Sequence, residues 1–252
     1  MQKKHSIIFY SLTVVAVAAL FIVGPVHQDC AYHNFADSRT VLGIPNFFNV
    51  ISNLPFVLIG FWGLYKLYGS SSNLFLKIAY FIFCLGIIFT GVGSAYYHWA
   101  PSSESLVWDR LPMTIAFMSF FSIMISPYFG KKREYLVLIV LLVSGFLSVF
   151  YWYLGDSGGE GDLRPYIFVQ YYPLVIVIIS LLMLPSSLFP KRLLAIAFFF
   201  YMLAKVFEIT DYQLYDLSNY ISGHTLKHLA AGVASLAIVA TYDKVKPSSG
   251  FD

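Results

Sequence analysis

The chain has 252 residues, of which 58% are hydrophobic and only 12% charged, with a net charge of +3. Soluble domains are about half apolar and about a quarter charged, so this composition excludes an ordinary soluble protein and predicts an integral membrane protein. We expect membrane lipids around it and no nucleic acid among its partners. At about 20 residues per membrane crossing, the length suits a single bundle of seven or eight helices.

The first apolar segment spans residues 6–24 and follows Lys3 and Lys4. A signal peptide has a similar charged start, but its apolar core is usually shorter and ends in a small-residue cleavage pattern, which is missing before Pro25. We therefore predict an uncleaved membrane anchor. Together with the polar stretch that follows it, the anchor forms a predicted amino-terminal region at residues 1–45, and the polar stretch is expected to be external.

Seven further apolar segments predict a bundle of membrane-spanning helices over residues 46–241. These segments lie at 46–68, 75–98, 109–128, 135–154, 166–184, 190–208 and 223–241. The polar residues 242–252 are predicted to form a disordered cytoplasmic tail. The expected fold is therefore all-α, a polytopic seven-helix bundle with one added amino-terminal anchor.

Basic residues predict the direction of the helices in the membrane. When loops are assigned alternately with the amino terminus inside, eleven of the sixteen Lys and Arg residues fall on the inner side. They are Lys3, Lys4, Lys66, Lys77, Lys131, Lys132, Arg133, Lys191, Arg192, Lys244 and Lys246. Because cationic flanks are retained on the cytoplasmic side, this bias predicts that the inner side is cytoplasmic.

Small and polar residues recur every four positions in the second core segment. Gly86, Thr90, Ser94 and His98 therefore share one face of the predicted helix, which ends in an imidazole. Asp109 is expected to open the next helix. Because a short turn joins the two helices, their ends must lie side by side and bring Asp109 near His98.

The last core segment carries two histidines spaced i, i+4. His224 and His228 therefore lie on one helical face, as in a metal-binding His pair. In the predicted topology they lie on the outer side, together with His98. Intramembrane histidines are functional candidates by default, and three histidines from two helices are typical of catalytic zinc, with a fourth position left for water.

Two residues beside these histidines are candidates for the chemistry. Asp109 would act as a general base that takes a proton from water and later delivers it to a leaving amine. Ser94 would donate a hydrogen bond to the developing oxyanion. Each residue taken singly also has a structural interpretation: a histidine at a helix end often makes an interfacial hydrogen bond, and Asp109 would serve as a helix cap.

Two other functions compete with hydrolysis. A receptor or transport protein would use the same metal site structurally, without turnover. A haem protein needs opposed ligands across the bundle, and only His98 opposes the pair formed by His224 and His228.

Further polar residues have structural interpretations. One set is expected to form interhelical hydrogen bonds in the first core segment: Asn46, Asn49, Ser52 and Asn53. Another is expected to be satisfied by mutual ion pairing: Lys205, Glu208 and Asp211. The acidic loop at 155–162 is expected to be solvated. The remaining residues considered have no spaced partner and are expected to be neither ligands nor disulfide-bonded: His5, His27, His33, Cys30 and Cys84.

The combined motifs resemble the alkaline ceramidase family. They are Ser-x-x-x-His followed eleven residues later by Asp, as Ser94, His98 and Asp109, and His-x-x-x-His, as His224 and His228. The resemblance implies zinc held by the three histidines, with the serine and the aspartate assisting hydrolysis of a lipid amide. That family belongs to a superfamily of seven-helix membrane hydrolases that also includes the adiponectin-receptor type.

The NFFNVISNLPF stretch resembles the start of the family's first core helix, so the similarity covers about residues 46–241. In the eukaryotic ceramidases, an acidic, Trp-containing segment before this helix binds calcium, and an acid stands where this chain has Asn46. Here only Asp29 and Asp37 remain in that region. Calcium is therefore a weaker expectation than zinc. For the disulfide that staples some relatives, this chain has no evident second cysteine.

Overall fold

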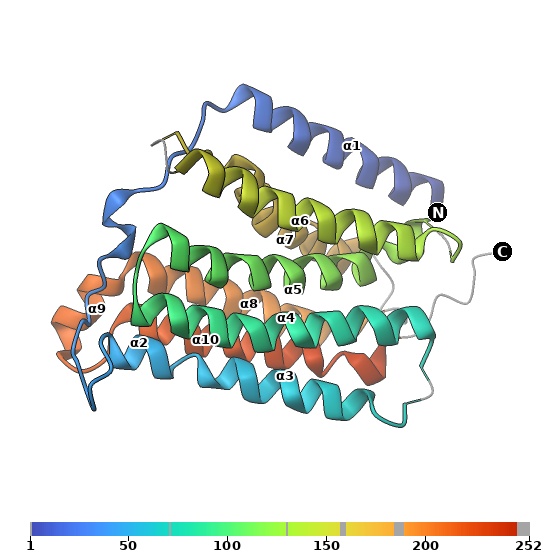
Figure 1. Ribbon diagram of the computed structural model, residues 1–252. Helices are drawn as coiled ribbons and strands as arrows, with labels where there is room; N and C mark the ends of the chain where they lie inside the picture. The colour runs from blue at the N-terminus through green and yellow to red at the C-terminus, as the bar shows by residue number, and fades with distance from the viewer. Residues whose placement is uncertain (1, 71, 130, 157–159, 184–188, 246–252) are drawn as a thin grey trace.

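The computed structural model describes residues 2–70, 72–129, 131–156, 160–183 and 189–245 (Figure 1). Within these residues the chain forms α-helices and two short 3-10 turns, with no β-strand. The elements are α1 (Gln2–Ile22), η1 (Cys30–His33), α2 (Phe47–Ile51), α3 (Leu54–Leu67), α4 (Leu74–Trp99), α5 (Ser103–Phe129), α6 (Glu134–Asp156), α7 (Arg164–Met183), α8 (Lys191–Ile209), α9 (Asp211–Ser218), α10 (Gly223–Val239) and η2 (Tyr242–Lys244). The all-α prediction is confirmed.

Every predicted core segment is helical, but the first is broken into α2 and α3. Ser52 and Asn53 separate the two helices, and Pro55 follows at the second position of α3. Proline lacks an amide proton, and its ring clashes with the carbonyl four residues earlier. The Ser52 hydroxyl and the Asn53 amide both donate to the carbonyl of Asn49, so side chains satisfy a group that a continuous helix would bond through its backbone.

Five helical spans of the described chain are long and apolar enough to cross a membrane. They are Phe47–Leu67, Leu74–Trp99, Ser103–Ser126, Glu134–Asp156 and Gly223–Lys244. A sixth is present if α8 and α9, which are bent by 76° at their junction, count as one span. The predicted spans at 6–24 and 166–184 are helical, with shorter apolar portions at Tyr10–Ile22 and Arg164–Ile179. The number of seven crossings plus an anchor stays a prediction.

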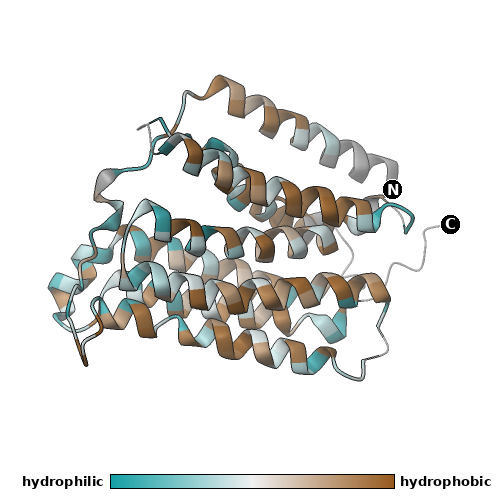
Figure 2. Cartoon of the chain, in the orientation of Figure 1, coloured by the Kyte–Doolittle hydropathy of each residue, from teal (hydrophilic) through white to brown (hydrophobic). Residues whose placement is uncertain are grey.

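The helices run alternately up and down the bundle, so that their ends gather at two opposite faces (Figure 1). One face carries the start of α1, the ends of α3 and α5 and the starts of α4 and α6. The opposite face carries α2, α9, the end of α4 and the start of α10. Hydrophilic residues concentrate at the ends and hydrophobic residues along the helix bodies (Figure 2). This is the distribution that a membrane-spanning bundle requires.

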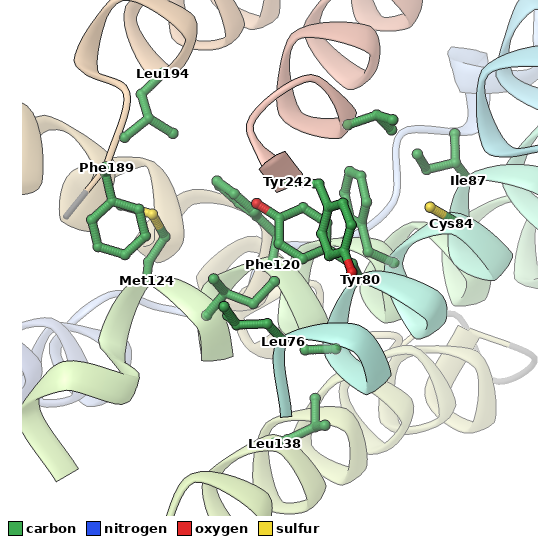
Figure 3. Close-up of a cluster of buried hydrophobic side chains, with 14 of the residues drawn as sticks. Leu76, Tyr80, Cys84, Ile87, Phe120, Met124, Leu138, Phe189, Leu194 and Tyr242 are labelled. Atoms are coloured by element: carbon green, nitrogen blue, oxygen red, sulfur yellow. The ribbon is translucent and has the colours of Figure 1, made fainter. Parts of the chain in front are cut away.

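Helix α4 lies at the centre, between α3 and α5, and contributes more buried residues to the main apolar cluster than any other helix. Tyr80, Phe120 and Tyr242 pack together in that core (Figure 3). Cys84 lies on the same helix and is a buried free thiol, as predicted. The side chain of Cys30, part of the acidic loop and most of the carboxyl-terminal tail lie outside the described residues.

Candidate metal centre and cavity

Three histidines converge at the polar end of the bundle. Nε2 of His98 lies 3.2 Å from Nε2 of His224 and 3.3 Å from Nε2 of His228. All three side chains are buried. Among the described residues, they form the one group of three His, Cys, Asp or Glu side chains close enough to share a metal ion. The structure therefore brings the predicted ligand set together.

The spacing of the three nitrogens fits a tetrahedral ion. Zinc–nitrogen bonds of about 2.0–2.1 Å at tetrahedral angles place two ligand nitrogens about 3.3–3.4 Å apart. The two observed separations of 3.2 and 3.3 Å are close to that value. Hydrogen bonding explains the cluster less well, because a neutral imidazole carries one proton and Nε2 of His98 faces both of the other Nε2 atoms. The three histidines can therefore hold a metal ion.

Side-chain hydrogen bonds orient His228. Its Nδ1 lies 2.8 Å from the Ser52 hydroxyl, at the break between α2 and α3. The neighbouring Asn49 is fully buried and accepts hydrogen bonds from the hydroxyls of Thr225 and Ser222 at the start of α10. The prediction that these polar residues join helices is confirmed for Ser52 and Asn49, whereas Asn53 bonds within its own segment. They also fix one candidate ligand, since a metal-binding histidine usually donates its other ring proton to a nearby acceptor.

The start of α10 is anchored through Asp211. One carboxylate oxygen accepts from the His224 amide at 2.7 Å, and the other accepts from the Ala36 amide at 3.1 Å. Gly223 permits this approach, because a Cβ there would lie 2.3 Å from the carbonyl oxygen of Phe207. The prediction that Asp211 belongs to an ion-paired set is therefore wrong. Its carboxylate instead satisfies amide protons, one of them in the first turn of α10.

Aromatic packing orients His98 and His224. The Phe35 ring lies 4.7 Å from the His98 ring and 4.9 Å from the His224 ring, both edge to face. Nδ1 of His98 has no hydrogen-bond partner among the described atoms, so this packing and that of Tyr97 hold the ring. Phe35 was not identified from the sequence, because an aromatic residue in a polar segment has no spacing that marks it.

Ser94 and Asp109 face each other across the contact between α4 and α5. Both side chains are buried and line the same cavity. Gly93 allows the close approach, since a Cβ there would lie 1.9 Å from the carbonyl oxygen of Trp108. The prediction that Asp109 opens its helix is wrong. Helix α5 begins at Ser103, about one and a half turns earlier, so Asp109 is not a helix cap.

A cavity of about 420 Å³ extends from these residues into the bundle. Ser94, Asp109 and His228 line one end, and Phe83 and Phe120 line the other. Ser94 and Phe83 are eleven residues apart on α4, or about 16 Å along its axis. The volume is in the range of sites that enclose small organic ligands. Away from His228 and the charged residues, the lining of the cavity is mostly apolar, which suits a hydrocarbon chain.

Charged residues occupy another part of the cavity wall. Glu208 pairs with Lys205 at 2.7 Å, as predicted, and also with Lys227 at 3.0 Å. Lys227 lies between the two histidines of α10 in the sequence, and its role was not identified from the sequence. A lysine in an apolar helix is costly unless it is paired. Its presence next to His228 could therefore have indicated an acidic partner on a neighbouring helix. All three charged side chains line the cavity.

The acids proposed as remnants of a calcium site have protein partners. Asp37 is buried and forms a two-pronged ion pair with Arg39. Asp29 accepts from the Ala31 amide and caps the 3-10 turn η1. Asn46 donates its side-chain amide to the carbonyl of His98 at 2.8 Å. The Asn46 contact joins the segment before α2 to the end of α4 that carries His98.

A family model described as Ceramidase matches residues 33–246. The chain belongs to the ceramidase family. The match begins before residue 46, where the motifs predicted the similarity to start. It therefore includes Phe35, which packs on His98 and His224. Ceramidase membership identifies the chain as a hydrolase of the amide bond of ceramide and, with its apolar helices, as an integral membrane protein. A search of curated proteins found no match.

Proposed function

We propose that this ceramidase-family protein is a zinc-dependent lipid amidase that uses His98, His224 and His228 as ligands. The observation that supports the metal is the convergence of three buried imidazoles, in which Nε2 of His98 lies at tetrahedral spacing from the other two Nε2 atoms. Three ligands leave a coordination position free, as in catalytic zinc sites. When bound, zinc would supply a Lewis acid and a water molecule that ionises near neutral pH.

Asp109 is the proposed general base. Its carboxylate lines the cavity beside Ser94 and His228. It would take a proton from the attacking water as the oxygen bonds to the amide carbon. It would then deliver that proton to the amine nitrogen as the carbon–nitrogen bond breaks, leaving a fatty acid and a free amine.

Ser94 is the proposed oxyanion donor. Its hydroxyl belongs to the same cavity end as Asp109, and it lies one helical turn before His98. In the resting enzyme the hydroxyl would donate to the Asp109 carboxylate. As negative charge develops on the amide oxygen, the hydroxyl would turn to donate to that oxygen instead. Asp109 would then be free to accept its proton.

The cavity supports a lipid substrate. Its apolar inner end, which includes Phe83 and Phe120, would hold the acyl chain. Burial of that chain would hold the amide beside Asp109. The attacking water and the amide carbon would then be held in a reactive orientation, which lowers the entropic cost of the reaction. The histidine cluster argues against haem, because Nε2 of His98 lies only 3.2 and 3.3 Å from the other two Nε2 atoms, which leaves no room for a porphyrin plane between opposed ligands.

We also propose the placement in the membrane. Residues 1–45 would form the anchor and external segment, 46–241 the catalytic bundle, and 242–252 the cytoplasmic tail. The helix ends that carry most of the predicted inner Lys and Arg residues gather opposite the histidines (Figure 1). Retention of basic flanks in the cytoplasm would then direct the active site to the external face.

Hydrolysis of a labelled ceramide by the purified full-length protein tests this function. We expect release of the fatty acid, loss of turnover after treatment with a chelator, and recovery when zinc is returned. Calcium is not required by the proposal. Turnover that persists in a preparation freed of metal would exclude the metal-dependent mechanism, and absence of turnover in the zinc-loaded protein would exclude the amidase.

A further inference from the structure

Arg110 is a buried cation next to the proposed general base. Its side chain is 4% exposed and lines the same cavity as Asp109. The guanidinium carbon lies 4.1 Å from the centre of the Trp152 ring and 4.9 Å from that of Tyr166. Aromatic faces attract a cation and hold it in place. The charge is therefore fixed at the wall of the cavity.

The hydrogen-bonding capacity of Arg110 is not used up by the protein. Nη2 donates to the side-chain carbonyl of Gln28, whereas Nη1 is buried and has no partner among the described atoms. No carboxylate of the described chain forms an ion pair with this guanidinium. A buried charge without a counter-ion is expensive, so an unpaired guanidinium in the cavity wall indicates a missing anionic or acceptor group.

The surrounding charges strengthen this indication. Lys227 lines the same cavity and shares one carboxylate, that of Glu208, with Lys205. The cavity wall thus carries three cations, Arg110, Lys205 and Lys227. It carries two carboxylates, Glu208 and Asp109. The field of Arg110 reaches the amino-terminal segment, where burial and then Arg110 lower the pKa of His33 and favour its neutral form. The wall keeps an excess of positive charge before any metal ion is added.

We propose that Arg110, with Lys227, forms a subsite for an anionic group on the amine half of the lipid amide. The inference rests on the proposed amidase function. Asp109 must reach the amine nitrogen, and Arg110 follows it directly in α5. The apolar end of the cavity is left for the acyl chain. The planar guanidinium is suited to phosphate or carboxylate, so the preferred substrate is a lipid amide that carries one of these groups close to the amide.

The test uses the full-length protein in detergent and two matched substrate pairs. One pair is ceramide 1-phosphate and ceramide with the same chains. The other is an N-acylglycine and the N-acylethanolamine of the same acyl length. We expect kcat/KM to favour the anionic member of at least one pair by about 10- to 100-fold, since a site built around a polar group discriminates strongly against an analogue that lacks it. A wild-type ratio near one in both pairs overturns the subsite.

Variants separate recognition from structural support. Arg110→Gln should reduce the anionic-to-neutral ratio of kcat/KM by at least about tenfold, and Arg110→Lys should restore part of it, because a charge remains. Gln28→Ala removes the hydrogen-bond acceptor but keeps the guanidinium, so its ratio should stay at the wild-type value. Arg133→Gln, at the opposite end of the bundle, is the control for loss of a cation. Equal losses on both members in Arg110→Gln mean that Arg110 only supports the fold.

A binding measurement distinguishes failure of the subsite from failure of the amidase. The same lipids are added to the protein and the midpoint of thermal unfolding is followed. Greater stabilisation by the anionic lipid, lost in Arg110→Gln, supports the subsite even in a protein that hydrolyses none of the four lipids. That result would overturn the amidase function alone. Hydrolysis of ceramide with no preference for the anionic member in turnover or stabilisation would overturn the subsite alone.

Discussion

The hydroxyl of Ser52 lies 2.8 Å from Nδ1 of His228, although 176 residues separate them in the chain. The same hydroxyl donates to the carbonyl of Asn49, so its lone pair is left to accept the Nδ1 proton. Nε2 of His228 then carries the lone pair that faces the other two histidines. The break between α2 and α3 thus determines which nitrogen of the candidate ligand is available for a metal ion.

Ser52→Ala should weaken zinc binding by about 10- to 100-fold without unfolding the protein, because it removes only an outer hydrogen bond of a ligand. Competition with a chelator of known affinity measures the change. Ser144→Ala is a matched control, since the Ser144 hydroxyl bonds to a carbonyl of its own helix on an exposed face. Equal zinc affinity of the Ser52→Ala and wild-type proteins would show that this contact does not tune the site.

Replacing any one of His98, His224 or His228 by Ala should remove most of the bound zinc, because only two protein ligands would remain. Metal analysis of the purified variants checks the result. His27→Ala provides the comparison, since His27 is exposed and lies outside the cluster. Unchanged zinc content in the His224→Ala protein would contradict the ligand assignment.

Asp109→Asn should abolish most turnover and remove the acidic limb of the pH–rate profile, while zinc is retained. The amide keeps the shape of the carboxylate but cannot accept the proton of water. Ser94→Ala should lower kcat by about 10²- to 10³-fold, as for loss of one oxyanion donor, and keep the pH profile. Asp109 lies within α5, so a capping role cannot explain its effect. A fully active Asp109→Asn enzyme would leave the reaction without its proposed base.

Gly93→Ala should destabilise the protein by about 1–3 kcal/mol or more and reduce activity, because its Cβ would collide with the backbone of Trp108 and push α4 away from α5. Thermal unfolding in detergent and ceramide turnover measure the two effects. Gly232→Ala is the control: its Cβ would meet its nearest neighbour, Pro55, at an ordinary 3.5 Å. Similar behaviour of the two variants would mean that the close helix contact does not position Ser94 against Asp109.

A reporter fused after Lys132 should be cytoplasmic, and a tag inserted in the 155–162 loop should be external, because basic flanks are retained in the cytoplasm. Accessibility of the tag in intact cells, compared with permeabilised cells, gives the answer. The reverse pattern would place the histidines at the cytoplasmic face and overturn the proposed location of the active site.

The sequence by itself determined the class of fold and the candidate metal ligands. Long apolar segments have one stable form in a membrane, because helices satisfy their backbone hydrogen bonds internally. The spacing of His224 and His228 on one such helix was equally readable, since the period of a helix places them on the same face. Ser94 and His98 followed from the same period on α4.

Only the tertiary structure decided how these parts meet. The beginning of α5 at Ser103 was missed because the helix starts with three polar residues, 103–105, ahead of its apolar positions. The roles of Phe35 and Arg110 depend on contacts between segments far apart in the chain, which local patterns do not contain. A histidine pair requires only the geometry of one helix, whereas the packing of an aromatic ring or a guanidinium depends on which helices become neighbours when the bundle closes.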